Sequence, residues 1–434
     1  MLAAMVAVAL CAQAEAPKKW TVHEWGTFTS VSDGRGGTVQ WAPFLEQSDL
    51  PAFVHSGFRF VEGFGKGGIY ANVRMETPVI YFYSDEDVLA SVRVRMPAGS
   101  LTEWYPSVLT SMPAGDSPDV HQQHSDAHLL DWGAFKVLPH AHDALPDEHK
   151  PSHYYAAREV DAAEVNVCTR EGGKAAVERE KFLFYRGVGT FQPPLSASFD
   201  ARARPLVRVD NGEATTFARP RGSGGLDAKG FSLTPRENLG EALVFERQGD
   251  QVGLKRVMLD GERHVDRVAS GSSVEEVKAA LVERLVAAGL YEKEAKAMVK
   301  TWNDSWFEPG LRVFYVEPAP MVEEQLPLEV APAPRERVRV IVGRLELFSP
   351  ARVDAVLREV AEAKARHAEY ELYPPMAEVF AKEGRFLDAI LAVAAAGASP
   401  AERTKLQQSR GALMGSVMST RQRAVTAIGA SATE

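Results

Sequence analysis

The stretch Trp20-Thr-Val-His-Glu-Trp-Gly-Thr-Phe-Thr29 alternates bulky and polar side chains over part of its length, which predicts a β-strand. After it, Gly34-Arg-Gly-Gly37 predicts a turn, and Thr38-Val-Gln-Trp41 is a candidate return strand. The run Pro78-Val-Ile-Tyr-Phe-Tyr83 is continuously apolar, which is typical of a strand covered on both faces. Further short strands are predicted at Ser91–Met96, Lys181–Tyr185, Leu206–Val209, Ala242–Glu246, Val252–Leu259, Leu311–Val316 and Val338–Phe348.

Many short strands with turns between them predict a β-rich α+β fold with an antiparallel, β-sandwich-like core over residues 15–348. Ser273-Val-Glu-Glu276 is a capping box that begins a helical hairpin over residues 273–307. The prolines of residues 317–334 predict an extended segment, either a linker or a strap on the core. Helical spacing of apolar residues predicts a C-terminal α-helical segment over residues 349–423, followed by a disordered tail, 424–434.

The composition limits the classes of protein to consider. The 434 residues are 45% hydrophobic and 25% charged, with a formal net charge of -9. These values are typical of a globular protein with a large core, and the negative charge argues against nucleic-acid binding. No apolar run after residue 16 approaches the ~20 residues that a membrane-spanning helix needs. Residues 1–14 have the character of a signal peptide, so we expect export to the periplasm or the extracellular space.

Removal of that signal peptide would leave Cys168 as the sole cysteine and exclude an internal disulfide. Cys168 ends an alternating stretch that predicts a strand, and its simplest interpretation is a buried, small apolar side chain. The alternative is a nucleophile or a soft metal ligand.

Several blocks of the sequence carry a resemblance to known proteins. They are Val22–Ser30, Glu76–Tyr83, Thr102–Pro106, His153–Arg158, Glu180–Gly187 and Trp302–Gly310. Together they resemble a family of large exported bacterial proteins, over residues 20–348. The resemblance implies export and a single compact core, and it implies no catalytic residue.

Histidine density is the strongest local signal for chemistry. Seven of the eleven histidines lie between residues 121 and 153, among several aspartates and glutamates. Neutral imidazole is a common ligand of zinc and copper, and carboxylates complete such sites. The alternatives are a solvated loop and weak, adventitious metal binding. The candidate metal ligands are His121, His124, His128, His140, His142 and His153.

Glu24 and Glu103 are the candidate catalytic carboxylates, either of which could act as a general base on a metal-activated water. Arg158 and Arg186 could pair with nearby carboxylates, such as Glu180, or bind an anionic substrate. In a strand, His23 and Glu24 point to opposite faces. Either the strand packs on one face with its polar residues at the rim, or His23 is a ligand or general base that the fold brings to His153.

Two main functions follow as hypotheses, and metal sequestration without catalysis is a third, narrower one. The first is an exported metal-dependent hydrolase that uses zinc or copper. The second is a non-catalytic cell-envelope or extracellular protein that binds a glycan or a protein, with the C-terminal helices as the docking site for a protein partner. The sequence leaves open whether the chain is an enzyme.

The metal hypothesis predicts about one equivalent of a single metal in tag-free protein that begins at Glu15 and is purified without chelator. Replacing His140 and His142 with alanine is expected to remove that metal. Mass spectrometry of metal content checks both statements, and substoichiometric mixed metals would contradict a specific site.

Overall fold

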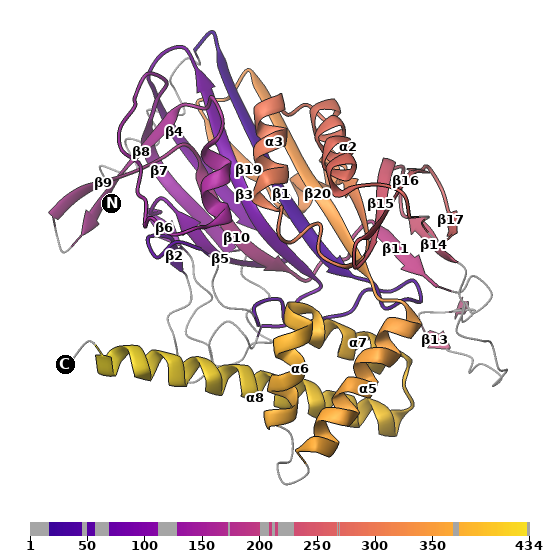
Figure 1. The fold of residues 1–434 in the computed structure, drawn as a ribbon. Helices are drawn as coiled ribbons and strands as arrows, with labels where there is room; N and C mark the ends of the chain where they lie inside the picture. The colour runs from indigo at the N-terminus through magenta and orange to yellow at the C-terminus, as the bar shows by residue number, and fades with distance from the viewer. Residues whose placement is uncertain are drawn as a thin grey trace.

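The computed structural model of the chain describes residues 17–45, 50–56, 69–111, 128–171, 174–199, 208–210, 213–215, 230–266, 268, 270–367 and 373–431. The signal peptide predicted for residues 1–14 lies outside these ranges, as do His121 and His124. Within them the chain forms a strand-rich body with a group of C-terminal helices at one end (Figure 1).

A nine-stranded sheet forms the centre of the molecule. Its neighbouring strands are antiparallel except for one parallel pair, β20 with β1. In spatial order the strands are β16 (Gln251–Leu259), β15 (Gly240–Gln248), β18 (Gly310–Val316), β20 (Glu336–Leu347), β1 (Trp20–Val31), β3 (Val73–Ser84), β10 (Leu183–Gly189), β5 (Gly99–Tyr105) and β2 (His55–Ser56).

A six-stranded sheet packs on one face of this large sheet. Phe82 of the large sheet and Phe135 of the second sheet belong to one buried cluster, with ring centroids 5.5 Å apart. The antiparallel β-sandwich-like core predicted from the sequence is therefore confirmed. The strands are β19 (Leu328–Ala331), β4 (Val88–Met96), β7 (His128–Leu138), β8 (Glu164–Glu171) and β9 (Lys174–Glu180), with β6 (Thr110–Ser111) paired to β7.

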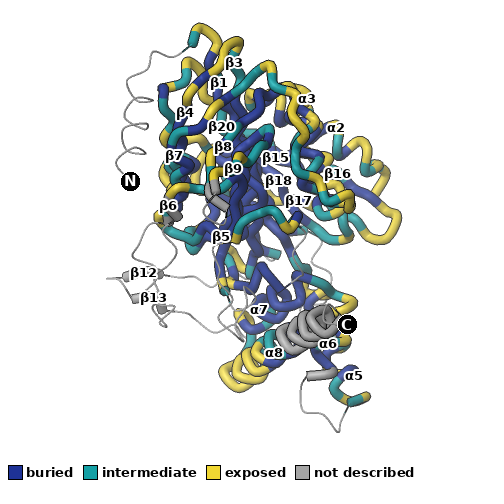
Figure 2. The backbone as a smooth tube through the Cα atoms, turned by 90° about the vertical axis from the view of Figure 1, so that its left-hand side faces the viewer, coloured by how far each residue is buried: buried dark blue, intermediate teal, exposed yellow. Residues whose placement is uncertain are grey.

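Strand β1 is buried on both faces because it lies between two layers. Trp25 belongs to the core on the helical side, whereas Val22 and Phe28 belong to the core between the sheets. His23 is 1% exposed and Glu24 is 0% exposed. The expectation of polar residues at the rim of a strand packed on one face is therefore wrong: Figure 2 shows buried backbone through the central strands.

The predicted helical hairpin covers the other face of the nine-stranded sheet (Figure 1). Helix α2 (Val274–Ala287) begins at the Ser273 capping box, and α3 (Glu292–Thr301) follows after Gly289, whose φ of 112° suits glycine. The 3-10 helix η3 (His153–Arg158) packs beside α3.

Two smaller β units complete the body. A three-stranded sheet contributes Leu195 and Phe231 to a core shared with the β15 and β18 end of the large sheet. The strands of this sheet are β11 (Leu195–Ser198), β14 (Gly230–Pro235) and β17 (Arg263–Asp266), and a separate pair is β12 (Arg208–Asp210) with β13 (Glu213–Thr215).

The proline-rich segment ties the two large sheets together. It contains helix α4 (Ala319–Gln325) and strand β19, which pairs with β4 of the six-stranded sheet before the chain returns to β20. The alternative of a strap on the core therefore fits better than a linker.

The C-terminal helices pack on the end of the body rather than beside it. They are α5 (Pro350–Arg366), α6 (Tyr373–Glu383), η4 (Gly384–Phe386), α7 (Leu387–Gly397) and α8 (Pro400–Ser431). Their apolar core includes Val31 and Trp41 from the β body. Helix α8 continues to Ser431, through most of the stretch for which we expected disorder.

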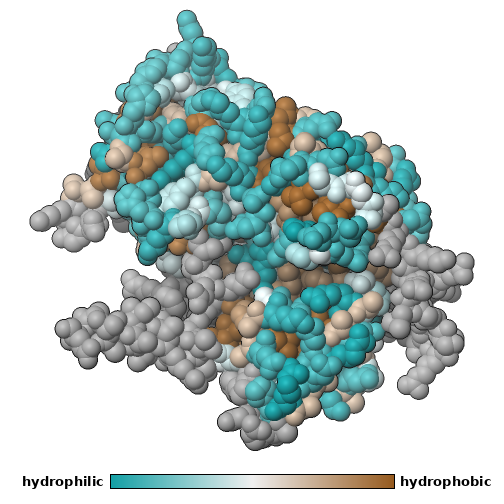
Figure 3. Space-filling model, in the orientation of Figure 1, coloured by the Kyte–Doolittle hydropathy of each residue, from teal (hydrophilic) through white to brown (hydrophobic). Residues whose placement is uncertain are grey.

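Cys168 lies in β8 as predicted, but its side chain is exposed, so the expectation of a buried cysteine is wrong. It pairs with Val177 of β9, which is 43% exposed. Strand β7 pairs with β8 only as far as Asn166, so this part of the β8–β9 hairpin extends beyond β7. In the view of Figure 3 the surface is mostly hydrophilic and its hydrophobic side chains form small, separate patches. Within the described part of the chain, no helix combines the length and the apolar character of a membrane span.

Glu317, just after β18, generates a prediction about stability. Burial is the main cause that raises the pKa of the Glu317 carboxyl to about 8, from an ordinary value of 4.5. Between these pH values the folded protein holds a proton that the unfolded chain has released, so the free energy of unfolding falls as pH rises. Glu317→Gln is expected to remove this loss and to stabilise the protein by roughly 2–4 kcal/mol near pH 8, with little effect near pH 4.5.

Denaturant unfolding at several pH values measures this difference, with Glu329→Gln, whose side chain is 56% exposed, as the control. Parallel pH profiles for the wild type and Glu317→Gln would contradict the prediction.

Candidate binding site

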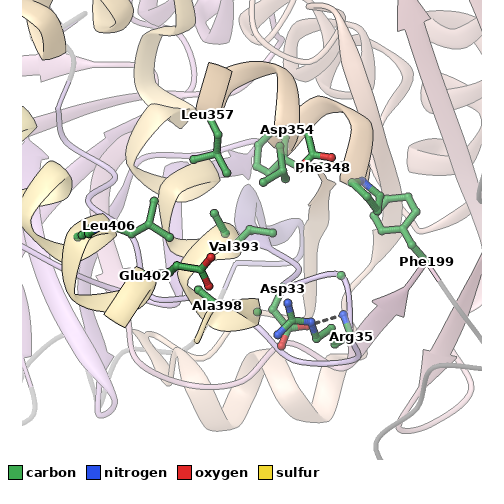
Figure 4. A pocket seen from close by; sticks show the side chains of 16 residues that line it. Asp33, Arg35, Phe199, Phe348, Asp354, Leu357, Val393, Ala398, Glu402 and Leu406 are labelled. Atoms are coloured by element: carbon green, nitrogen blue, oxygen red, sulfur yellow. Dashed lines mark hydrogen bonds between the residues drawn. The ribbon is translucent and has the colours of Figure 1, made fainter. Parts of the chain in front are cut away.

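A cavity of about 520 Å³ lies where the C-terminal helices meet the turn after β1 (Figure 4). Strands β1 and β20 are parallel neighbours, so both end at the same edge of the sheet. The turn after β1 and the segment that leads from β20 into α5 therefore form adjoining walls, and this volume is typical of small-molecule sites. The lining residues are Asp33, Gly34, Arg35, Phe199, Phe348, Pro350, Val353, Asp354, Leu357, Val393, Ala394, Gly397, Ala398, Glu402, Lys405 and Leu406.

The turn that forms one wall is held by its own aspartate. Asp33 Oδ1 accepts hydrogen bonds from the backbone N–H groups of Arg35 at 2.7 Å and Gly37 at 2.8 Å. Gly34 and Gly36 have φ values of 74° and 98°, in the left-handed region that favours glycine. The predicted turn is confirmed, whereas the predicted return strand is wrong, because only isolated bridges form at Thr38 and Trp41.

Arg35 fastens this turn to helix α7. Its guanidinium donates to the backbone oxygen of Ala396, one of the last carbonyls of the helix. The next residue is Gly397, and a Cβ there would collide with the Arg35 guanidinium. The glycine therefore lets an arginine from the β body cap a C-terminal helix.

The aromatic wall of the cavity depends on a second aromatic side chain behind it. The Phe348 ring packs against Phe386 of η4, with centroids 5.7 Å apart and planes at 61°. The Phe386 ring also faces the guanidinium groups of Arg344 at 5.6 Å and Arg385 at 4.9 Å. Phe386, which supports Phe348 in the cavity wall, is therefore itself in contact with two arginines.

These arginines belong to a run of alternating charges, which we call the ionic chain. It passes from β3 through η4 and the segment after α3 to β20 and β18, and only Glu308 among its members is markedly exposed, at 32% of its side chain. The successive contacts are Arg74–Glu76 at 3.0 Å, Glu76–Arg385 at 3.8 Å, Arg385–Glu308 at 2.6 Å, Glu308–Arg344 at 2.9 Å, Arg344–Glu346 at 2.6 Å and Glu346–Arg312 at 2.9 Å.

The ionic chain keeps its carboxylates charged although they are buried. Burial alone would raise the pKa of Glu76, but four surrounding arginines, Arg74, Arg385, Arg344 and Arg186, hold that pKa below its usual value. The same balance lowers the pKa of Glu308. The ionic chain therefore joins the helices to the sheet through ionised groups.

Glu24 and Glu103, the predicted catalytic carboxylates, both lie inside the nine-stranded sheet. Glu24 Oε2 is 2.6 Å from Arg339 Nε, and its other oxygen accepts a hydrogen bond from the Tyr185 hydroxyl. Glu103 is 3% exposed and accepts a hydrogen bond from Thr102 Oγ1. Neither residue lines the cavity, and their catalytic role stays a prediction.

The predicted metal ligands are only partly described. The side chain of His128 lies outside the described part of the structure, as do the residues His121 and His124. His140 and His142 follow the end of β7 and are exposed, and the His153 ring packs 5.5 Å from Trp302. Among the described residues no three histidine, cysteine or acidic side chains gather as a metal site, so metal binding also stays a prediction.

His23 has a different partner from the one considered. Its Nδ1 lies 2.8 Å from Oε2 of Glu294, whose other oxygen accepts a hydrogen bond from the Tyr83 hydroxyl at 2.8 Å. His153 packs on Trp302, eight residues after Glu294, which is about 12 Å along the axis of α3. The two histidines therefore have different neighbours on α3, and a shared role for them stays a prediction.

Sequence reasoning missed one polar cluster of Ser107, His55 and Glu178, because these residues are far apart in the chain. Ser107 Oγ lies 2.9 Å from both His55 Nε2 and Glu178 Oε1, and these last two atoms are 3.0 Å apart. Serine and carboxylate meet the same ring nitrogen, unlike a catalytic triad, where they use opposite nitrogens. The Ser107 N–H also donates to Glu178, so this cluster ties β9 to the segment after β5.

The comparisons with known proteins give no relative from which a function could be carried over. No protein-family model matches the sequence, and no curated protein matches it. Among solved structures, the Fcho1 Mu homology domain of Danio rerio with a bound Eps15 peptide is 9% identical. The match covers 78% of this chain and 97% of that chain, with a TM-score of 0.24, which carries no argument about fold or function.

Replacement of Glu76 tests how much the ionic chain contributes to the stability of the fold. Glu76→Gln leaves the surrounding arginines without their central negative charge and is expected to cost about 3 kcal/mol of unfolding free energy at pH 7. Because the pKa of Glu76 is lowered in the folded protein, this stabilisation is present above the ordinary carboxyl pKa and is lost as pH falls through the folded value. The variant is therefore expected to approach the wild type in acid.

Guanidinium chloride unfolding at pH 7 and at acid pH measures both effects. Glu329→Gln removes a solvent-exposed carboxylate near Arg93 and Arg95 and is expected to cost less than about 1 kcal/mol. Equal losses for the two variants would show that the ionic chain is no more important than a surface pair.

Proposed function

We propose that this protein is an exported, non-catalytic binding protein that holds a small, largely apolar ligand in the cavity beneath its C-terminal helices. The cavity is the observation that carries the proposal. Its walls are mainly apolar side chains, including Phe348, Leu357 and Val393. Removal of water from such walls by an apolar ligand lowers the free energy of the complex. Export rests on the signal-like residues 1–14 and on the family resemblance.

The charged groups at the cavity favour binding over catalysis. Asp33 and Arg35 use their polar atoms to hold the turn and the end of α7. Glu402 accepts hydrogen bonds from the backbone and the hydroxyl of Ser399 at the start of α8. These side chains fix the walls, and a pre-formed wall lowers the cost of ordering a site around its ligand.

The C-terminal helices therefore have a more specific role than the protein docking that we expected from the sequence. Helices α5, α7 and α8 each contribute to the lining, whereas the β body contributes the turn, Phe199 and Phe348. An apolar side chain of a protein partner could enter only by taking the place of the small ligand.

The neutral dye N-phenyl-1-naphthylamine tests the cavity, because its fluorescence reports transfer to an apolar site. Saturable binding at about one equivalent is expected for the full chain. Ala394 of α7 lines the cavity, whereas Ala361 is an exposed alanine of α5 that does not line it. Ala394→Trp fills the site and is expected to weaken dye binding at least tenfold, whereas Ala361→Trp is expected to leave it unchanged.

Circular dichroism and thermal unfolding establish that both variants are folded. If the dye fails to saturate, or if the two variants bind it equally, the cavity does not bind ligands in solution and the proposed function is wrong.

A further inference from the structure

We infer that the ligand of this cavity carries a positively charged amine on an apolar body. This inference rests on the proposed function and adds the chemical class of the ligand. It comes from the charged side chains among the lining residues and from what each already binds. Three of them are carboxylates, Asp33, Asp354 and Glu402, and two are cations, Arg35 and Lys405.

The two cations do not balance the carboxylates inside the cavity. The Arg35 guanidinium donates to the Ala396 oxygen, and its charge offsets the partial negative charge at the C-terminal end of α7. Lys405 is exposed on α8, where water surrounds its ammonium group. Glu402 on the same helix is also exposed, so the half-buried charges that a bound ligand meets are the carboxylates of Asp33 and Asp354, and their balance is negative.

Asp354 is the carboxylate best placed to receive a ligand. It lies in α5 and is half-buried, and Figure 4 shows it beside Phe348 and Leu357, on the opposite side of the cavity from Glu402. Asp33 and Glu402 bind backbone N–H groups nearby. For Asp354, by contrast, the described residues supply neither a hydrogen bond nor an ion pair.

The loss of water from the Asp354 carboxylate on ligand binding favours a ligand with a positively charged head group. A ligand that fills the cavity removes water from Asp354, and an ionised carboxylate without water or a partner is costly. A neutral ligand leaves this cost in place, and an anionic ligand adds repulsion. An ammonium group replaces the lost water with a charge-assisted hydrogen bond, while its apolar body covers the walls that Phe348 and Leu357 provide.

Three ligands with the same tail test the inference: octylamine, 1-octanol and octanoate, each displacing N-phenyl-1-naphthylamine from the full chain at pH 7. Octylamine is expected to bind about tenfold more tightly than 1-octanol, and octanoate more weakly than both. Asp354→Asn is expected to lower octylamine affinity about tenfold and to leave 1-octanol affinity unchanged or improved.

Asp250→Asn, in the exposed turn between β15 and β16, is the matched control and is expected to change none of the three affinities. If the dye binds, but the amine and the alcohol compete equally and Asp354→Asn changes neither, the inference about the amine is wrong and the proposed function stands. If the dye does not bind at all, the proposed function itself is wrong.

Discussion

The parallel pairing of β1 with β20 is the constraint on which the rest of this structure depends. It joins Thr21 to Glu336 and Val31 to Glu346, residues more than three hundred positions apart in the chain. A parallel pair cannot be closed by a tight turn, so the chain must cross over between the two strands, and here that connection contains the other strands of both large sheets. Because the strands run in the same direction, the segments that leave them emerge together. This geometry places the Asp33 turn beside the start of α5 and so creates the cavity.

The junction between helices and sheet combines an apolar core with buried charges. Replacing a buried ion pair by well-packed apolar side chains is often neutral or stabilising, so the ionic chain is not explained by stability alone. It does constrain geometry: Arg385 contacts both Glu308 and Glu76, which holds η4 to the segment after α3 and to β3. That arrangement positions Phe386, and Phe386 in turn positions Phe348 at the cavity. The buried charges therefore specify where the helices sit.

Sequence reasoning succeeded where the signal is local. The strands at Pro78–Tyr83 and Val338–Phe348, and the capping box at Ser273, follow from side chains a few positions apart, and the structure confirms them. The partners of the buried polar groups could not be predicted from the sequence. His23 contacts Glu294 and Glu24 contacts Arg339 across separations of 271 and 315 residues, and the periodicity of neither segment indicates these contacts.

The density of histidines before His153 is a local signal of another kind, because closeness in sequence does not require closeness of side chains. The exposed His140 and His142 follow the end of a strand, whereas the His153 ring packs against Trp302.

Because the walls of the cavity come from two parts of the chain, ligand binding and helix docking cannot be independent. Asp33 and Arg35 belong to the β body, whereas Asp354 and Val393 belong to the helices. A ligand that contacts both parts has a complete site only when the helices are docked. Its binding free energy therefore stabilises the docked arrangement. By the same linkage, any loosening of the ionic chain must weaken ligand binding, although none of its side chains lines the cavity. Arg35 takes part in both processes, since it lines the cavity and caps α7. Only substitutions inside the cavity that leave the docking contacts intact can therefore separate the affinity for the ligand from the attachment of the helices.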